Sequence, residues 1–103
     1  MEDLVAKKLD PVQVEAVVRD VVRTVLTANG GDPVAADTPD NPLTASGQHF
    51  DSVSSEEATV MIGVQLGVSI DRNPFFSNDQ KPAASFDDIV KSICEQEYEE
   101  REG

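Results

Sequence analysis

The chain has 103 residues, of which 20 are acidic and 8 are basic, giving a net charge of −12. A chain of this length forms one domain with a single modest core, so we treat residues 1–103 as one domain. The negative charge repels phosphate backbones and anionic lipid head groups, which argues against nucleic-acid and membrane binding and favours partners with basic patches.

The N-terminus and the cysteine content are typical of a cytoplasmic protein. The first ten residues mix charges and do not resemble a secretory signal, and no apolar run approaches the roughly 18 residues that span a bilayer. Cys94 is the only cysteine and has no metal-ligand spacing with His49. We expect a cytoplasmic monomer without a bound metal.

The first expected element is a helix over residues 11–28, preceded by an extension over 1–9. Asp10 can cap the helix, and Pro11 suits its first turn. Its valines recur at helical spacing and predict a core-facing stripe. The stripe comprises Val14, Val17, Val18, Val21, Val22 and Val25.

Residues 29–49 read as a long loop. Asn29-Gly30-Gly31 is typical of a helix end, and three prolines follow. Loops of this length are uncommon in compact domains, so we expect Val34 or Leu43 to attach it to the core.

A second helix is expected to begin near Ser52 or Ser54. Ser54 and Glu57 have the spacing of a capping box, which places Glu56 and Glu57 in the first turn. A core-facing stripe follows, made of Ala58, Met61, Ile62 and Leu66. Because the run is rich in β-branched residues, a strand is the competing reading, and the capping box favours the helix.

The C-terminal third predicts one loop and one helix. Residues 71–82 read as a loop with one short helical turn, in which Phe75 and Phe76 fill the core. Ser85 and Asp88 open a last helix through about residue 98, followed by an acidic tail over 97–103. Its apolar face comprises Phe86, Ile89, Val90, Ile93 and Cys94. The fold class is all-α: a small four-helix bundle with three long helices, one short helix and a long first loop.

Ser52 is the candidate site residue. A hydroxyl at a helix N-terminus lies beside unpaired backbone amides, and the helix dipole favours a phosphate ester there. By position alone, a simple capping serine is the alternative.

The run Phe50-Asp51-Ser52-Val53 resembles the acyl carrier protein family. The glycine at 67, the Phe75-Phe76 segment and the final amphipathic helix agree with it, so the resemblance covers residues 11–96. It implies that Ser52 carries a covalent 4′-phosphopantetheine arm, that Asp51 helps a phosphopantetheinyl transferase to recognise the site, and that Val53 replaces the usual leucine.

The resemblance also implies a partner-binding face on the second helix. Glu56 and Glu57 would meet basic groups of acyl-transferring and condensing enzymes, while Ala58, Ile62 and Leu66 would turn toward the core and the acyl chain. Gly63 and Val64 stand where the family commonly shows carboxylates. Together with Val60 they predict docking by apolar contact, unless the long loop covers them.

The implied function is carriage of acyl groups for fatty-acid or polyketide-type biosynthesis rather than catalysis. A peptidyl or aminoacyl carrier is one alternative, and an unmodified acidic helical interaction module is another. A hydrolase with Ser52 as nucleophile and His49 as base is disfavoured, because the chain lacks the G-x-S-x-G turn. We expect His49 to be a surface loop residue and Cys94 to be buried.

Overall fold

The computed structural model describes residues 9–77, 81–83 and 85–96 and has the predicted all-α fold. No strand occurs in these ranges, where two isolated bridges join Asp40 to Ser85 and Phe76 to Pro82. The elements are α1 (Pro11–Ala28), η1 (Pro33–Asp37), α2 (Pro42–Ala45), η2 (Gly47–His49), α3 (Ser52–Leu66) and α4 (Phe86–Glu95), where η denotes a 3-10 helix. Of the predicted N-terminal extension only Leu9 is described, and the predicted acidic tail lies outside the described residues.

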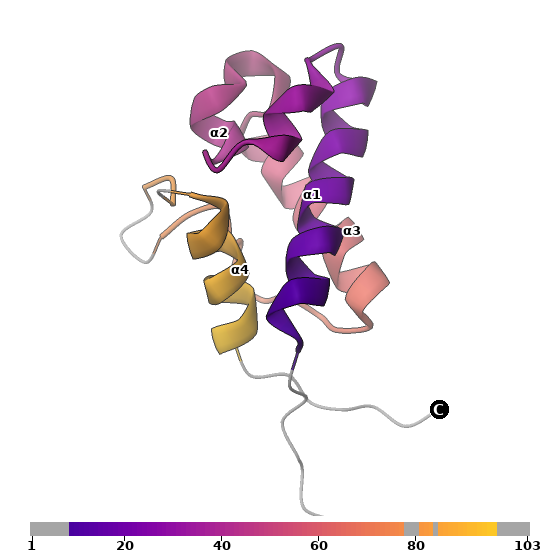
Figure 1. The fold of residues 1–103 in the computed structure, drawn as a ribbon, viewed down its shortest axis with the longest axis vertical. Helices are drawn as coiled ribbons and strands as arrows, with labels where there is room; N and C mark the ends of the chain where they lie inside the picture. The colour runs from indigo at the N-terminus through magenta and orange to yellow at the C-terminus, as the bar shows by residue number, and fades with distance from the viewer. Residues whose placement is uncertain (1–8, 78–80, 84, 97–103) are drawn as a thin grey trace, which may run out of the picture.

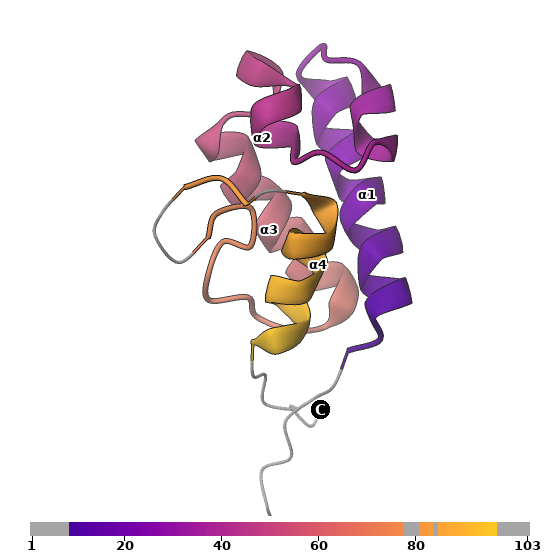
Figure 2. The ribbon, with the colours of Figure 1, turned by 60° about the vertical axis from the view of Figure 1, so that its left-hand side comes forward.

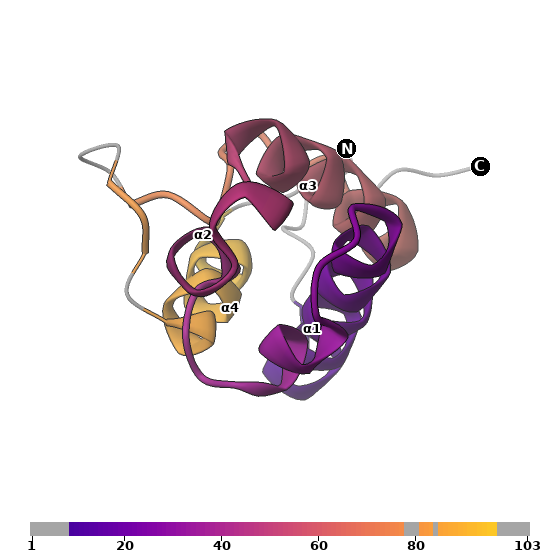
Figure 3. The same cartoon turned by 90° about the horizontal axis from the view of Figure 1, so that it is seen from above.

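The three longer helices surround one core. α1 packs against both α3 and α4, and both run antiparallel to it (Figure 1). Viewed from above, the three helices enclose a common centre (Figure 3). Phe50, Phe75 and Phe86 are fully buried there, and the rings of Phe50 and Phe75 lie 5.3 Å apart. Phe75 therefore fills the core as predicted, whereas Phe76 is only half-buried.

Local signals set the ends of α1 as predicted. The Asp10 carboxylate accepts a hydrogen bond from the Val12 amide at 3.0 Å, and Pro11 begins the helix. Gly30, just past the Asn29 cap, has a positive φ of 79°, which glycine adopts without strain. The stripe of valines is buried, except that Val17 is half-buried.

The segment 29–49 is more ordered than predicted. It contains η1, α2 and η2, which together cover one end of the bundle (Figures 1 and 3). Asp32 and Asn41 cap η1 and α2, and a proline follows each cap. The short helix therefore lies in the first connection. Within 71–82, the described residues form a loop with one hydrogen-bonded turn at residues 74–75, where the Phe76 amide donates to the Asn73 carbonyl at 3.3 Å, and no helix is assigned among them.

The first connection is attached to the core by residues other than Val34. Of the two residues expected to attach it, Leu43 packs against the core, whereas Val34 is 62% exposed. Asn41 is fully buried, and its amide group donates hydrogen bonds to the carbonyls of Phe75 and Ala83, each at 2.9 Å. One side chain therefore links three separate stretches of chain.

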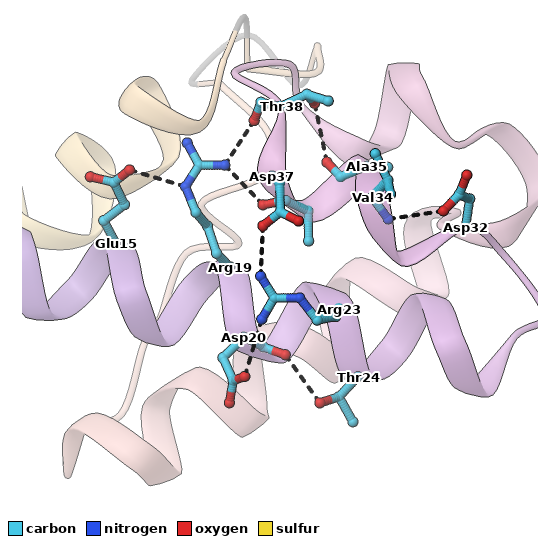
Figure 4. A network of polar contacts seen from close by, with 11 residues as sticks. Glu15, Arg19, Asp20, Arg23, Thr24, Asp32, Val34, Ala35, Asp37 and Thr38 are labelled. Atoms are coloured by element: carbon cyan, nitrogen blue, oxygen red, sulfur yellow. Dashed lines mark hydrogen bonds and ion pairs between the residues drawn. The ribbon is translucent and has the colours of Figure 1, made fainter.

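Arginines of α1 hold the other side of this connection (Figure 4). Arg19 donates to the carbonyls of Ala36 at 2.9 Å and Thr38 at 2.8 Å, and its guanidinium carbon lies 4.2 Å from the centre of the Phe86 ring. Arg23 pairs with Asp37 at 2.7 Å. The connection is thus fixed to both α1 and α4.

The last helix begins as predicted and ends before the predicted residue 98. Ser85 caps α4 by accepting a hydrogen bond from the Asp88 amide at 3.3 Å, and α4 ends at Glu95. The segment after α3 crosses toward α4, so that α3, this segment and α4 lie side by side (Figure 2). Within the described ranges, no helix is both long enough and apolar enough to cross a membrane.

Candidate functional site

Ser52 is the first residue of α3 and is exposed, and Asp51 caps the helix. The Asp51 carboxylate accepts a hydrogen bond from the Ser54 amide at 2.9 Å. That bond is the main reason why the pKa of Asp51 lies below its ordinary value of 3.8, and the Ser54 hydroxyl adds to the effect. The structure thus assigns capping to the residue before Ser52.

The predicted capping box of Ser54 and Glu57 is therefore wrong. Ser54 lies inside the helix and is buried, and its hydroxyl accepts a hydrogen bond from the Asn29 side chain at 3.1 Å. Glu56 and Glu57 fall beyond the first turn, which contains no acidic residue. Asp51 caps the helix about one turn earlier than Ser54 would. The Ser54 hydroxyl is therefore available to accept the hydrogen bond from Asn29 at the end of α1.

His49 lies at the junction of α1 and α3. Its carbonyl accepts from the Asn29 side chain at 3.0 Å, and its Nδ1 lies 3.2 Å from the Asn29 carbonyl. The residue is half-buried rather than a freely exposed loop residue. It lines a different cavity from Ser52, so the structure does not bring these two side chains to one site.

A second set of hydrogen bonds ties the start of α3 to the segment that follows it. The Ser55 hydroxyl donates to the Ser52 carbonyl at 2.7 Å and accepts from the Asn73 side chain at 2.8 Å. Asn73 in turn accepts from the Phe75 amide at 2.9 Å. No local pattern in the sequence indicates the contact of Asn73 with Ser55, because the two residues lie 18 positions apart.

Ser52 lines an open groove of about 750 Å³. Its walls come from α3, from residues 70–77 and from α4. The lining residues are Ser52, Glu56, Thr59, Val60, Ile70, Asp71, Arg72, Asn73, Phe76, Ser77 and Ser92. Cavities that bind drug-sized ligands span about 300–1,000 Å³, so this groove has room for a flexible arm or its cargo.

The outer face of α3 exposes apolar side chains, as predicted. Val53, Val60 and Val64 are 73%, 67% and 76% exposed, so the first connection does not cover them. Their spacing places them in one stripe along the helix with Glu57, and Glu56 lies at its edge. The residues expected to bind partners are therefore together on one accessible surface.

Gly63 does not belong to that surface, which corrects its predicted role. It is buried, and a Cβ added there would lie 2.7 Å from the Val68 carbonyl oxygen. The Val68 amide donates to the Gly63 carbonyl at 2.9 Å, and Gly67 has a positive φ of 73°. Gly63 is thus needed where the chain turns back at the end of α3.

The inner face of α3 is close to the prediction. Ala58, Ile62 and Leu66 are buried, and Met61 is half-buried.

Cys94 on α4 is half-buried rather than buried. Partial burial and, to a smaller extent, the charges of Asp10 and Glu95 raise the pKa of its thiol. The described ranges hold no group of three or more His, Cys, Asp or Glu side chains placed to bind a metal.

No protein-family model, curated protein or solved structure matches this chain.

Proposed function

We propose that this chain is a carrier protein of the acyl carrier type, modified on Ser52 with 4′-phosphopantetheine and serving fatty-acid or polyketide-type biosynthesis. The observation that carries the proposal is the position of Ser52. Its exposed side chain lies at the start of a helix, lines a groove and is next to an exposed apolar stripe.

The residues around Ser52 fit a phosphodiester. The amides of a first helical turn have no intrahelical acceptor, and the helix dipole favours negative charge there. The Asp51 carboxylate accepts from the Ser54 amide and caps the helix, and Ser52, its first residue, is exposed. When bound, the group supplies a terminal thiol that holds an acyl chain as a thioester.

The stripe of Val53, Val60 and Val64 is proposed as the docking face for the transferase and for the acyl-transferring and condensing enzymes. Glu56 and Glu57 border it, and the net charge of −12 favours encounter with basic patches. A carrier must leave one enzyme to reach the next, so a small apolar stripe suits short-lived contacts.

Intact-mass measurement tests the modification. The folded protein is incubated with coenzyme A and a promiscuous phosphopantetheinyl transferase, so that the Ser52 hydroxyl displaces adenosine bisphosphate and gives up its proton. We expect the mass of one phosphopantetheine to be gained by the native chain, none by Ser52→Ala, and the full gain by the matched control Ser69→Ala, whose serine is exposed outside α3. A folded protein without the gain would instead be an unmodified acidic interaction module.

Loading kinetics test the docking face. We expect Val60→Ser combined with Val64→Ser to lower kcat/KM for loading about fivefold, because two valine contacts of roughly 1 kcal/mol in total are lost. The matched control is Val12→Ser, since Val12 is 76% exposed but lies on α1. Equal loading of the native chain, the double variant and the control would show that the transferase does not dock on this face.

A further inference from the structure

A buried serine in the first turn of α3 joins Ser52 to the segment that follows the helix. Ser55 is fully buried, and its hydroxyl takes part in two hydrogen bonds. It donates to the Ser52 carbonyl at 2.7 Å and accepts from the Asn73 side chain at 2.8 Å. These two bonds, which we call the Asn73–Ser55–Ser52 link, use the buried hydroxyl both as a donor and as an acceptor.

The Asn73 end of the link is fixed to the core. The Asn73 side-chain oxygen accepts from the Phe75 amide at 2.9 Å, and Phe75 is fully buried. The Phe75 carbonyl accepts a further hydrogen bond from the buried Asn41 side chain at 2.9 Å. The Ser52 carbonyl is therefore bonded, through Ser55, to a well-held part of the fold.

The link acts on the backbone of the residue that carries the proposed modification. Ser52 is the first residue of α3, and helix ends ordinarily fray. The link bonds to the carbonyl of Ser52 and leaves its exposed hydroxyl out of the network. Holding the carbonyl limits the movement of the Ser52 backbone, and so of the hydroxyl that an enzyme must receive in one geometry.

Stability does not by itself require the link. Burying a hydroxyl costs free energy unless it is hydrogen-bonded, and replacing both partners of a bond by apolar groups of the same shape can leave stability nearly unchanged. An apolar pair at positions 55 and 73 would fill the same space. It would not supply the bond to the Ser52 carbonyl, which is the feature that the polar pair adds.

We infer that Asn73 and Ser55 are positioning residues for the loading of Ser52. The inference rests on the proposed function, because it concerns the step in which the transferase attaches the arm. Neither residue belongs to the stripe of exposed valines that we propose as the docking face. The link should therefore affect the geometry of the hydroxyl within the transferase complex and not the formation of that complex.

Steady-state loading kinetics separate these two effects. The full chain is loaded from coenzyme A by the promiscuous transferase, and kcat and KM for the native chain are compared with those of Ser55→Ala and Asn73→Ser. The Asn73→Ser substitution keeps an uncharged acceptor for the Phe75 amide but is too short to reach Ser55.

We expect kcat to fall about three- to tenfold in each single variant with KM unchanged, because a displacement of about 1 Å can lower a rate by up to ~100-fold. The double variant should have the same kcat as Ser55→Ala, since Asn73 acts through Ser55. If one single variant does not fold, the other carries the comparison with the native chain.

Arg19→Ala is the control for a loss of stability. We expect it to be at least as destabilised, but the contacts of Arg19 with Ala36, Thr38 and Phe86 lie outside the link. Its kcat and KM should equal those of the native chain well below its Tm, and thermal melts verify that each protein is folded.

Three results overturn the inference and leave the carrier function standing. They are an unchanged kcat in both single variants, a change confined to KM, and an equal fall of kcat in folded Arg19→Ala. A folded native chain that gains no phosphopantetheine removes the proposed function, and the inference falls with it.

Discussion

Asp51 has two roles at the start of α3. It satisfies the Ser54 amide at 2.9 Å, and it holds the exposed side chain of Ser52 at the first position of the helix. The Asp51 carboxylate is exposed, and the hydrogen bond from the Ser54 amide stabilises its ionised form.

The pH dependence of Asp51→Ala follows from its lowered pKa. Because the folded-state pKa lies below the ordinary 3.8, the ionised carboxylate stabilises the fold fully above that value. We expect Asp51→Ala to lower Tm by a few degrees at neutral pH. The difference from the native chain should then shrink as the pH falls from 3.8 through the lower folded-state pKa. Thermal melts across this range measure it, and a difference that grows on acidification would contradict the assignment.

The replacement of Gly63 has a clear expected effect on stability. Glycine in a helix interior ordinarily costs about 1 kcal/mol relative to alanine, so Gly63→Ala would stabilise an open helix. Here the added methyl group would meet the Val68 carbonyl at 2.7 Å. We expect a net loss of about 1–3 kcal/mol in urea unfolding.

The neighbouring position provides the control for Gly63→Ala. Val64 is exposed, so Val64→Ala should change stability by less than about 0.5 kcal/mol. A Gly63→Ala protein more stable than the native chain would show that residue 63 does not contact the turn after α3.

At the scale of elements, Arg19 joins three of them. From α1 it donates to the carbonyls of Ala36 and Thr38 around the end of η1 (Figure 4). Its guanidinium group also lies over the Phe86 ring of α4. Its side chain is 21% exposed, whereas that of Arg23 is 41% exposed in its pairs with Asp20 and Asp37. Arg19 therefore bonds to backbone carbonyls with little access to water, whereas Arg23 pairs with carboxylates at the surface.

We expect Arg19→Ala to cost about 2–4 kcal/mol in urea unfolding, because it leaves two carbonyls without their charged donor and removes the contact with Phe86. Arg23→Ala should cost less than about 1 kcal/mol, since exposed ion pairs contribute little. Equal losses in the two variants would mean that Arg19 does not hold the first connection in place.

At the scale of the whole molecule, the net charge of −12 opposes the compact state. Screening weakens this repulsion, and the Debye length falls to about 8 Å near 0.15 M salt. We therefore expect Tm to rise by several degrees between low and moderate salt, and also on adding a divalent cation. A flat or falling Tm in calorimetry would show that self-repulsion does not limit stability.

Much of the fold follows from local signals in the sequence. Asp10-Pro11, Asn29-Gly30 and Ser85 mark ends of α1 and α4 with little error, because caps and left-handed residues act within a few positions. The same logic applies to Asp32-Pro33 and Asn41-Pro42, which begin η1 and α2. Both signals lie in residues 29–49, where the prolines make the segment resemble a plain loop.

An acidic all-α domain with an apolar α3 and an exposed serine near its start can be predicted from sequence, because capping, helical periodicity and net charge depend on neighbouring residues or on simple counts. The cap of α3 by Asp51, the inward position of Gly63 and the place of Ser52 in the lining of a groove emerge only in the folded chain. These features depend on contacts such as that of Asn73 with Ser55, 18 positions apart, or of Asn41 with Ala83, 42 positions apart. Local patterns do not encode such distances, since the packing of the whole chain sets them.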